Sequence, residues 1–369
     1  MELKRLYFID AIRAFAILMM LQGHFIDTLL AIEYRDPNNI AFTTWQYFRG
    51  ITAPVFFTIS GLIFTYLLIK AKEKGSLNQR IKKGIIRGLM LIVIGYALRI
   101  PVFRWLSGSF GTYFMVIDVL QIIGLSLILI LAIYILYQKK TLLFSITMLF
   151  LGTFIFLNEP LYRTFTAEGI PLFFANYLTK INGSIFTILP WFGYMAYGAF
   201  IATLFYRYLL RPRFKIAIVS GFFAVGLGLI YGSSILLHWL TTVTDISLFL
   251  EVANYNYLFV RLGNVLVLFG VFYAFESYLK HPVILKIGQK TLSIYVIHFI
   301  LLYGSFTGLG LNKIFGKNLT AIEAITGALC FLVGVSLISI YIIKANTQVY
   351  GFFRRKAIKL KALINSLNT

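Results

Sequence analysis

The first apolar segment of the chain carries four ionisable side chains: Asp10, Arg13, His24 and Asp27. At 100° per residue, Arg13 and His24 project from nearly the same face of a helix, about 16 Å apart along its axis. Around the helix axis, Asp10 and Asp27 each lie within about 60° of Arg13 or His24. The four residues therefore form a polar stripe along one side of the helix. A charged group at membrane depth is costly unless it faces a cavity or a partner. The stripe is therefore the first candidate for chemistry.

Imidazole is the side chain best suited to move a proton near neutral pH. Asp27 follows His24 by almost one helical turn, so its carboxylate could hold the imidazole in one tautomer and make His24 a general base. A hydrogen-bonded contact between helices is the alternative for His24. For Asp10 and Arg13 the alternative is an ion pair at the membrane interface.

Two further segments carry polar groups. Arg49 precedes a span that Pro54 allows to kink or to start after a broken turn. Arg49 either binds an anionic or hydroxylated ligand or anchors the helix end. Tyr295 and His298 are spaced i, i+3, so they share a helix face that lines a polar cavity or packs against a neighbour.

Asp118 and Gln121 share another face by the same spacing. A buried carboxylate needs a cationic or hydrogen-bonding partner, because leaving it unpaired is costly. For Asp118 the candidate partners are Arg49, Arg99 and Arg261.

The composition defines the setting of these residues. Of 369 residues, 59% are hydrophobic and only 13% are charged, and the mean hydropathy is +0.84, as in a membrane protein. The net charge of +21 comes from short basic clusters between apolar runs, so it indicates membrane topology and not a nucleic-acid partner. The single cysteine, Cys330, excludes an internal disulfide and a cysteine-based metal site, and no metal is expected.

The apolar runs predict an all-α polytopic membrane protein, a bundle of about ten transmembrane helices. Most of the 34 basic residues fall on the side of Lys4 and Arg5, so both termini are expected in the cytoplasm. Residues 1–345 are expected to form one transmembrane domain, followed by a basic cytoplasmic tail over 346–369. The expected spans are Phe8 to Ala31, Ile51 to Leu68, Ile85 to Phe103, Phe114 to Tyr137, Thr141 to Leu157, Ser184 to Tyr206, Phe214 to Leu237, Tyr257 to Leu279, Thr291 to Leu311 and Leu319 to Ile343.

The longest loop runs from Asn158 to Gly183 and is expected on the outer face. It either roofs a cavity or covers helix ends. Gly228 with Gly232, and Gly304 with Gly308, form small-xxx-small pairs that predict close helix packing.

Several common catalytic motifs are absent. The chain has no Walker sequence, no H-E-x-x-H and no G-x-S-x-G, so nucleotide hydrolysis, zinc proteolysis and serine-hydrolase chemistry lose their usual support. Acyl transfer and proton-coupled transport remain.

Three stretches together resemble the transmembrane acyltransferase superfamily: "FIDAIRAFAILMMLQGHF", "PVFFTISG" and "IGQKTLSIYVIH". This superfamily includes the acyltransferase family 3 enzymes and the catalytic domain of heparan-alpha-glucosaminide N-acetyltransferase. The most specific element is an arginine, ten residues and a histidine, matched here by Arg13 and His24. The stretches "DVLQIIGLSL" and "PWFGYMAYG" lean toward the heparan acetyltransferase branch.

The resemblance implies transfer of an acyl group, usually acetyl from acetyl-coenzyme A, to a sugar hydroxyl or amine at the outer side. The implied partners are acyl-coenzyme A, a carbohydrate or glycolipid acceptor and membrane lipid, and the implied location is the cell inner membrane. Animal members of the heparan branch place the catalytic histidine in the loop after the first span. This chain has no histidine between Asp27 and Trp45, so the resemblance assigns that role to His24, as in acyltransferase family 3.

The implied roles divide the candidate residues into three groups. His24 acts as general base or transient acyl acceptor, and Asp27 stabilises its imidazolium. The groups expected to bind the coenzyme are Arg13, Asp10 and Arg87. The groups expected to bind the acceptor are Arg49, Asp118, Gln121, Tyr295 and His298.

The alternative function is a proton-coupled transporter or flippase for a polar or lipid-linked solute. That alternative predicts two duplicated halves with corresponding Gly- or Pro-broken spans, and the sequence shows no such pair. A non-catalytic scaffold would leave the stripe unexplained.

Overall fold

The computed structural model describes residues 6–342 together with 351, 355, 356 and 358. Throughout this part of the chain the elements are helices, and one isolated bridge joins Leu30 and Leu319. Lys4, Arg5 and nearly all of the predicted tail over 346–369 lie outside the described residues.

The helices fall into two length classes. The longer ones are α1 (Tyr7–Leu29), α3 (Thr52–Glu73), α4 (Leu77–Ala97), α6 (Val119–Leu136), α7 (Thr141–Leu157), α10 (Ile188–Tyr208), α11 (Phe214–Leu227), α12 (Ser233–Thr244), α14 (Tyr257–Ala274), α16 (Thr291–Tyr303) and α18 (Ala321–Leu337). The shorter ones are α2 (Ile40–Arg49), α5 (Val102–Leu106), α8 (Glu159–Arg163), α9 (Leu172–Leu178), α13 (Ser247–Asn254), α15 (Pro282–Gln289) and α17 (Leu311–Ile314).

Within the described residues, seven helical stretches are long and apolar enough to cross a membrane, and an eighth is added if α15 and α16, bent by 69°, form one span. The seven are Tyr7–Leu29, Ile40–Glu73, Thr112–Leu136, Ile188–Tyr208, Phe214–Thr244, Tyr257–Ala274 and Ala321–Ile340. The prediction of an all-helical membrane bundle is therefore confirmed, whereas the count of ten spans and the side of the termini are not. The two remaining predicted spans are the strongly basic α4 and the 17-residue α7.

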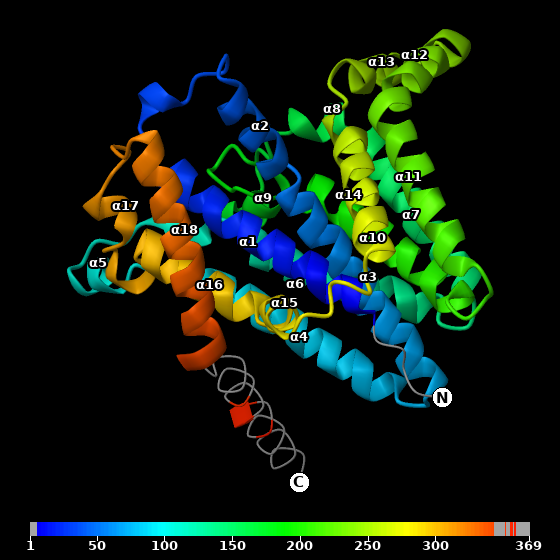
Figure 1. Cartoon of the computed structure of the whole chain (residues 1–369), viewed down its shortest axis with the longest axis horizontal. Coiled ribbons are helices and arrows are strands. Elements are labelled where there is room, and N and C mark those ends of the chain that lie inside the picture. Colours follow the sequence, from blue (N-terminus) through cyan, green and yellow to red (C-terminus); the bar gives the residue numbers. More distant parts are fainter. Residues whose placement is uncertain (1–5, 343–350, 352–354, 357, 359–369) are drawn as a thin grey trace.

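Helix α1 occupies the middle of the bundle (Figure 1). It packs against α3, α14, α15, α16 and α18. Because neighbours surround it, polar side chains on α1 meet protein groups or an internal cavity and not lipid.

Glycines allow a close helix crossing between α3 and α10. A Cβ added to Gly61 would overlap the carbonyl oxygen of Met195, and one added to Gly198 would overlap that of Thr58. The α4–α6 and α11–α14 crossings use the same device, with the residues Gly88, Gly124, Gly226 and Gly263. Such backbone contact is how membrane helices gain packing energy where lipid supplies no hydrophobic drive.

The two glycine pairs that were predicted to pack helices closely do not do so. A Cβ at Gly228 or Gly232 would meet open space, so neither residue mediates a helix crossing. Gly304 and Gly308 have φ of +79° and +68°, the left-handed region that favours glycine, and they form the turn after α16. The packing prediction was wrong for both pairs, because spacing alone does not show which face a neighbouring helix covers.

The segment from Asn158 to Gly183 contains α8 and α9. Asn176 donates to the Met115 carbonyl at 2.9 Å, and the Tyr96 hydroxyl donates to that of Tyr177 at 3.0 Å. These contacts place the segment over the ends of α4 and α6. Of the two predicted uses, the structure shows the covering of helix ends.

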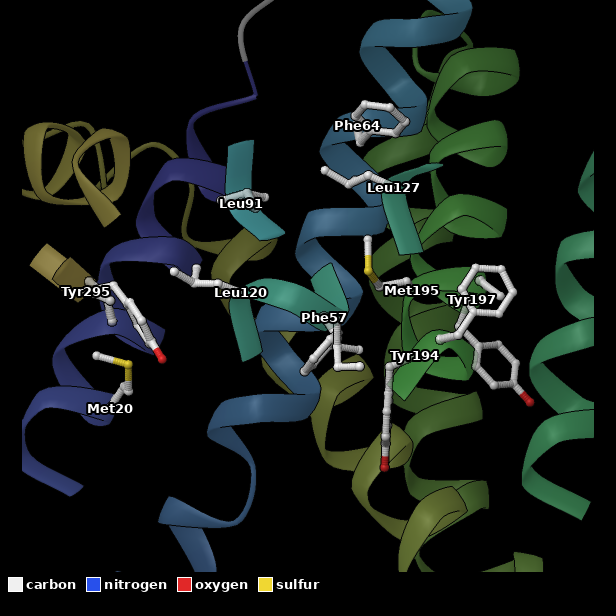
Figure 2. Packing of buried hydrophobic residues seen from close by; sticks show 14 of the residues in the cluster. Met20, Phe57, Phe64, Leu91, Leu120, Leu127, Tyr194, Met195, Tyr197 and Tyr295 are labelled. Carbon is white, nitrogen blue, oxygen red and sulfur yellow. The ribbon is translucent and has the colours of Figure 1, made fainter. Parts of the chain in front are cut away.

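Side chains of the largest buried cluster surround the centre of the bundle (Figure 2). Figure 2 shows side chains from α1, α4 and α16, with Leu120 of α6, gathered on one side, and others from α3 and α10, with Leu127 of α6, on the opposite side. The labelled members of the first group are Met20, Leu91, Leu120 and Tyr295, and those of the second include Phe57, Phe64, Tyr194 and Met195.

Candidate functional site

A cavity of about 450 Å³ lies between α1, α3, α4, α6, α10 and α16. One end, called here the arginine end, is lined by Arg13, Arg80, Arg87 and Thr291. The other, called the histidine end, is lined by His24, Arg49, Asp118 and Trp191. Between them the wall is mainly apolar, with Ile17, Met20, Phe64, Leu91 and Leu127. One cavity therefore includes both Arg13 and His24, as expected from their shared helix face.

Basic side chains concentrate at the arginine end. Arg13 donates to Oγ1 of Thr291 at 2.8 Å, and its guanidinium lies 3.9 Å from the Asp10 carboxylate, which is not part of the cavity wall. Arg80 and Arg87 are seven residues apart on α4 and so share a helix face. Arg87 was predicted from the sequence as a site residue. Arg80 and Thr291 were not, because only the fold brings α4 and α16 next to Arg13.

Aromatic and imidazole groups surround His24 at the other end. Its Nδ1 lies 3.0 Å from the Tyr303 hydroxyl, to which Thr28 also donates at 3.4 Å. The His298 ring lies 5.4 Å from the His24 ring and is 1% exposed, so it stands behind the cavity wall. Tyr295, 4.9 Å from His298 between ring centroids, lines the cavity.

Tyr303 is a further site residue that was not predicted from the sequence. It lies five positions after His298 and eight after Tyr295, about 140° and 80° away around the helix axis, so helix spacing selects it only weakly. The sequence feature that could have pointed to Tyr303 is its place at the end of the apolar run that contains Tyr295 and His298.

Asp27 has its partner on another element. Its carboxylate forms an ion pair with Arg49, at the end of α2, and its backbone carbonyl accepts from Arg35 at 2.8 Å. Arg49 also stacks over the Trp45 ring at 5.8 Å. These contacts place Asp27 beside Arg49, whereas the contact to the His24 imidazole is made by Tyr303.

Asp118 forms an ion pair with Arg99, the Nη2–Oδ2 distance being 2.7 Å. Its other oxygen accepts from the Val119 backbone at 2.7 Å, and Gln121 accepts from the Asp118 backbone at 3.2 Å. Asp118 thus caps α6 and lines the cavity, while Gln121 is buried in the capping box and is not part of the wall. Of its three candidate partners, Arg99 is the one observed. Arg261 instead donates to the Tyr47 carbonyl at 2.8 Å.

The predicted site residues therefore fall into two groups by position. Those in the cavity wall are Arg13, His24, Arg49, Arg87, Asp118 and Tyr295. Those that contact the wall from behind or beside it are Asp10, Asp27, Gln121 and His298.

Residues 5–243 match the family described as "Heparan-alpha-glucosaminide N-acetyltransferase, catalytic". The match covers well over half of the 369 residues. The chain belongs to this family. Membership in the heparan-alpha-glucosaminide N-acetyltransferase catalytic family identifies an acetyltransferase-type membrane enzyme and confirms the resemblance drawn from the motifs. No curated protein matches the sequence.

The N-acetyltransferase family match ends before the last part of the site. Arg13, His24, Arg87 and Asp118 lie within it. The four site residues on α16 lie beyond residue 243: Thr291, Tyr295, His298 and Tyr303.

Proposed function

We propose that the protein transfers an acetyl group from acetyl-coenzyme A to a hydroxyl or amine of a sugar, carried by a glycan or a glycolipid. The observation that carries the proposal is one cavity that joins the three arginines of its arginine end to His24. The arginines suit a phosphate-bearing donor, and the histidine suits proton transfer from an acceptor.

The donor is proposed to enter at the arginine end. Arg13, Arg80 and Arg87 supply guanidinium groups, which bind phosphate oxygens in a bidentate manner. The apolar middle of the cavity then accommodates the pantetheine arm. Arg13 and His24, eleven residues apart on α1, are separated by about 16 Å along the helix axis, so an extended arm bound by Arg13 brings its thioester near His24.

His24 is proposed to act on the acceptor. Its Nε2 takes the proton of the acceptor hydroxyl or amine while the acceptor oxygen or nitrogen bonds to the thioester carbonyl carbon. The carbon–sulfur bond then breaks, and the coenzyme leaves as a thiol after the imidazolium returns the proton. In the second route, Nε2 itself takes the acetyl group from the coenzyme and passes it to the acceptor.

The orientation follows the distribution of basic residues. Clusters such as Lys82 with Lys83 and Lys139 with Lys140 lie on the side expected to be cytoplasmic, because positively charged loops are retained there. Arg80 and Arg87 belong to the same side. The proposal therefore places donor entry in the cytoplasm and the acceptor at the outer face of a cell membrane, with residues 1–345 as one transmembrane domain.

The test uses the purified full chain, acetyl-coenzyme A labelled in the acetyl group, and amino and neutral sugars as acceptors. We expect His24→Ala to lose label transfer by about 10²- to 10⁴-fold, the usual contribution of a general base. His238→Ala is the matched control, because His238 is exposed on α12, away from the cavity, and it should keep the wild-type rate. Equal transfer by wild type and His24→Ala would reject the catalytic assignment. Uptake of unmodified sugar into proteoliposomes, without acetylation, would favour a transporter.

A further inference from the structure

Helix α16 closes the histidine end from outside the part of the chain that the family match covers. Its last residue, Tyr303, places its hydroxyl 3.0 Å from Nδ1 of His24. The Thr28 hydroxyl, one turn after His24 on α1, donates to the same oxygen at 3.4 Å. Two side chains of α1 thus meet one phenol from α16.

We propose that Tyr303 is the positioning residue for His24 and fixes the orientation of its imidazole ring. This inference rests on the proposed function and deepens it. In the tautomer that the proposed function uses, Nδ1–H donates to the Tyr303 oxygen and the lone pair of the imidazole is on Nε2, the nitrogen left for the acceptor. A second group that fixes the orientation of a catalytic histidine is a recurring feature of acid–base sites.

The Tyr303 ring is held in place on several sides. The Phe299 ring lies 5.0 Å from it and the His298 ring 6.4 Å. Gly304, in the left-handed region, ends the helix directly after Tyr303, and Ser305 then donates to the Leu98 carbonyl at 2.7 Å. This hydrogen bond holds the end of α16 against the end of α4. The Tyr303 hydroxyl is thereby kept next to the His24 imidazole.

The contact persists through the proton cycle that the proposed function requires. When Nε2 takes the acceptor proton, Nδ1–H stays bonded to the Tyr303 oxygen and the positive charge is shared by a hydrogen-bonded imidazolium. When the proton moves on to the departing coenzyme sulfur, the original tautomer is restored. Tyr303 itself neither gains nor loses a proton.

The test variant is Tyr303→Phe, which removes one hydroxyl and keeps the ring. We expect kcat to fall about 10- to 100-fold, part of the contribution of a general base, with KM for acetyl-coenzyme A unchanged because the arginine end is untouched. Tyr231→Phe is the matched control, since Tyr231 is 75% exposed, and its kinetic constants should equal those of wild type. Thr28→Val, a milder change to the same contact, should lower kcat in the same direction by less.

A double variant separates positioning from a general structural role. If Tyr303 acts through His24, Tyr303→Phe has no further effect on the residual rate of His24→Ala, because coupled residues are not additive. An unchanged kcat in Tyr303→Phe, or a full additional loss in the His24→Ala background, would overturn the inference while leaving the proposed function standing. Full activity of His24→Ala would instead remove the base assignment on which the inference rests.

Discussion

Arg99 donates to Asp118 across 2.7 Å, and the two side chains are only 3% and 11% exposed. Arg99 also lies under the rings of Tyr113 and Phe299, at 5.1 and 5.6 Å. The pair joins the segment after α4 to the start of α6 and touches α16. Asp118 in turn lines the cavity near His24, so one buried ion pair connects three helices to the site.

Removing one partner of this ion pair should lower the stability of the fold. Arg99→Met leaves the Asp118 carboxylate buried without its cation, and breaking a buried pair in this way typically costs about 3–5 kcal/mol. We expect the thermal unfolding midpoint in detergent to fall well below that of Arg104→Met, a control in which the arginine is exposed. Equal midpoints for the two variants would show that the pair does not stabilise the fold.

Arg87 provides a test of donor binding. Arg87→Gln should raise KM for acetyl-coenzyme A about tenfold, equivalent to about 1.4 kcal/mol of binding, and leave kcat nearly unchanged because His24 is distant. Lys82→Gln is the matched control, since Lys82 is exposed on α4 and is not in the cavity wall. The difference between the variants should shrink as salt is added, because ions screen exposed charges. A lower kcat with unchanged KM would contradict this role.

The α3–α10 crossing predicts a large effect from one methyl group. In Gly198→Ala the new Cβ would overlap the Thr58 carbonyl and lie 2.9 Å from the Leu62 nitrogen, so the helices must move apart. Such overpacking costs about 1–3 kcal/mol, occasionally more, and we expect a lower unfolding midpoint. Gly221→Ala, where a Cβ meets nothing within 4 Å, should be neutral or slightly stabilising. The same midpoint in both variants would argue against close backbone contact.

Glu159, outside the spans on α8, predicts a pH dependence of stability. Burial raises the pKa of Glu159 above its usual value of 4.5, against the opposing effect of Arg163 and Lys180. A carboxyl whose pKa is higher when folded destabilises the protein once ionised, a cost that is absent below the unfolded pKa and fully present above the folded one. Glu159→Gln should therefore raise the unfolding midpoint at pH 8, with the difference shrinking toward pH 4.5. The control is Glu168→Gln, at an exposed position, and a pH-independent difference for Glu159→Gln would contradict the argument.

Helix periodicity predicted the part of the site that lies within single helices. The angular spacing on α1 placed Arg13 and His24 on one face, and both line the cavity. The need to neutralise a buried carboxylate reduced the partners of Asp118 to three, including the correct one, Arg99. Helix geometry and the free-energy cost of an unpaired buried charge both follow from the sequence itself.

Contacts between distant helices could not be obtained in this way. Asp27 pairs with Arg49 because α2 packs back over the end of α1, and Tyr303 reaches His24 across 279 positions. The number of spans was also uncertain for a physical reason. In α4 the first half is basic and only the second half is apolar, so hydropathy alone does not show how far it enters a membrane.

The two ion pairs near His24 have an electrical consequence. Asp27 with Arg49, and Arg99 with Asp118, each combine one positive and one negative charge, so these four side chains leave the histidine end formally neutral. A transmembrane voltage does about 2.3 kcal/mol of work per elementary charge per 100 mV, and an acetyl group carries no charge. In the proposed reaction the donor and the acceptor each keep their charge, so passage of the acetyl group to the outer side would move no net charge and its equilibrium would be independent of the membrane voltage.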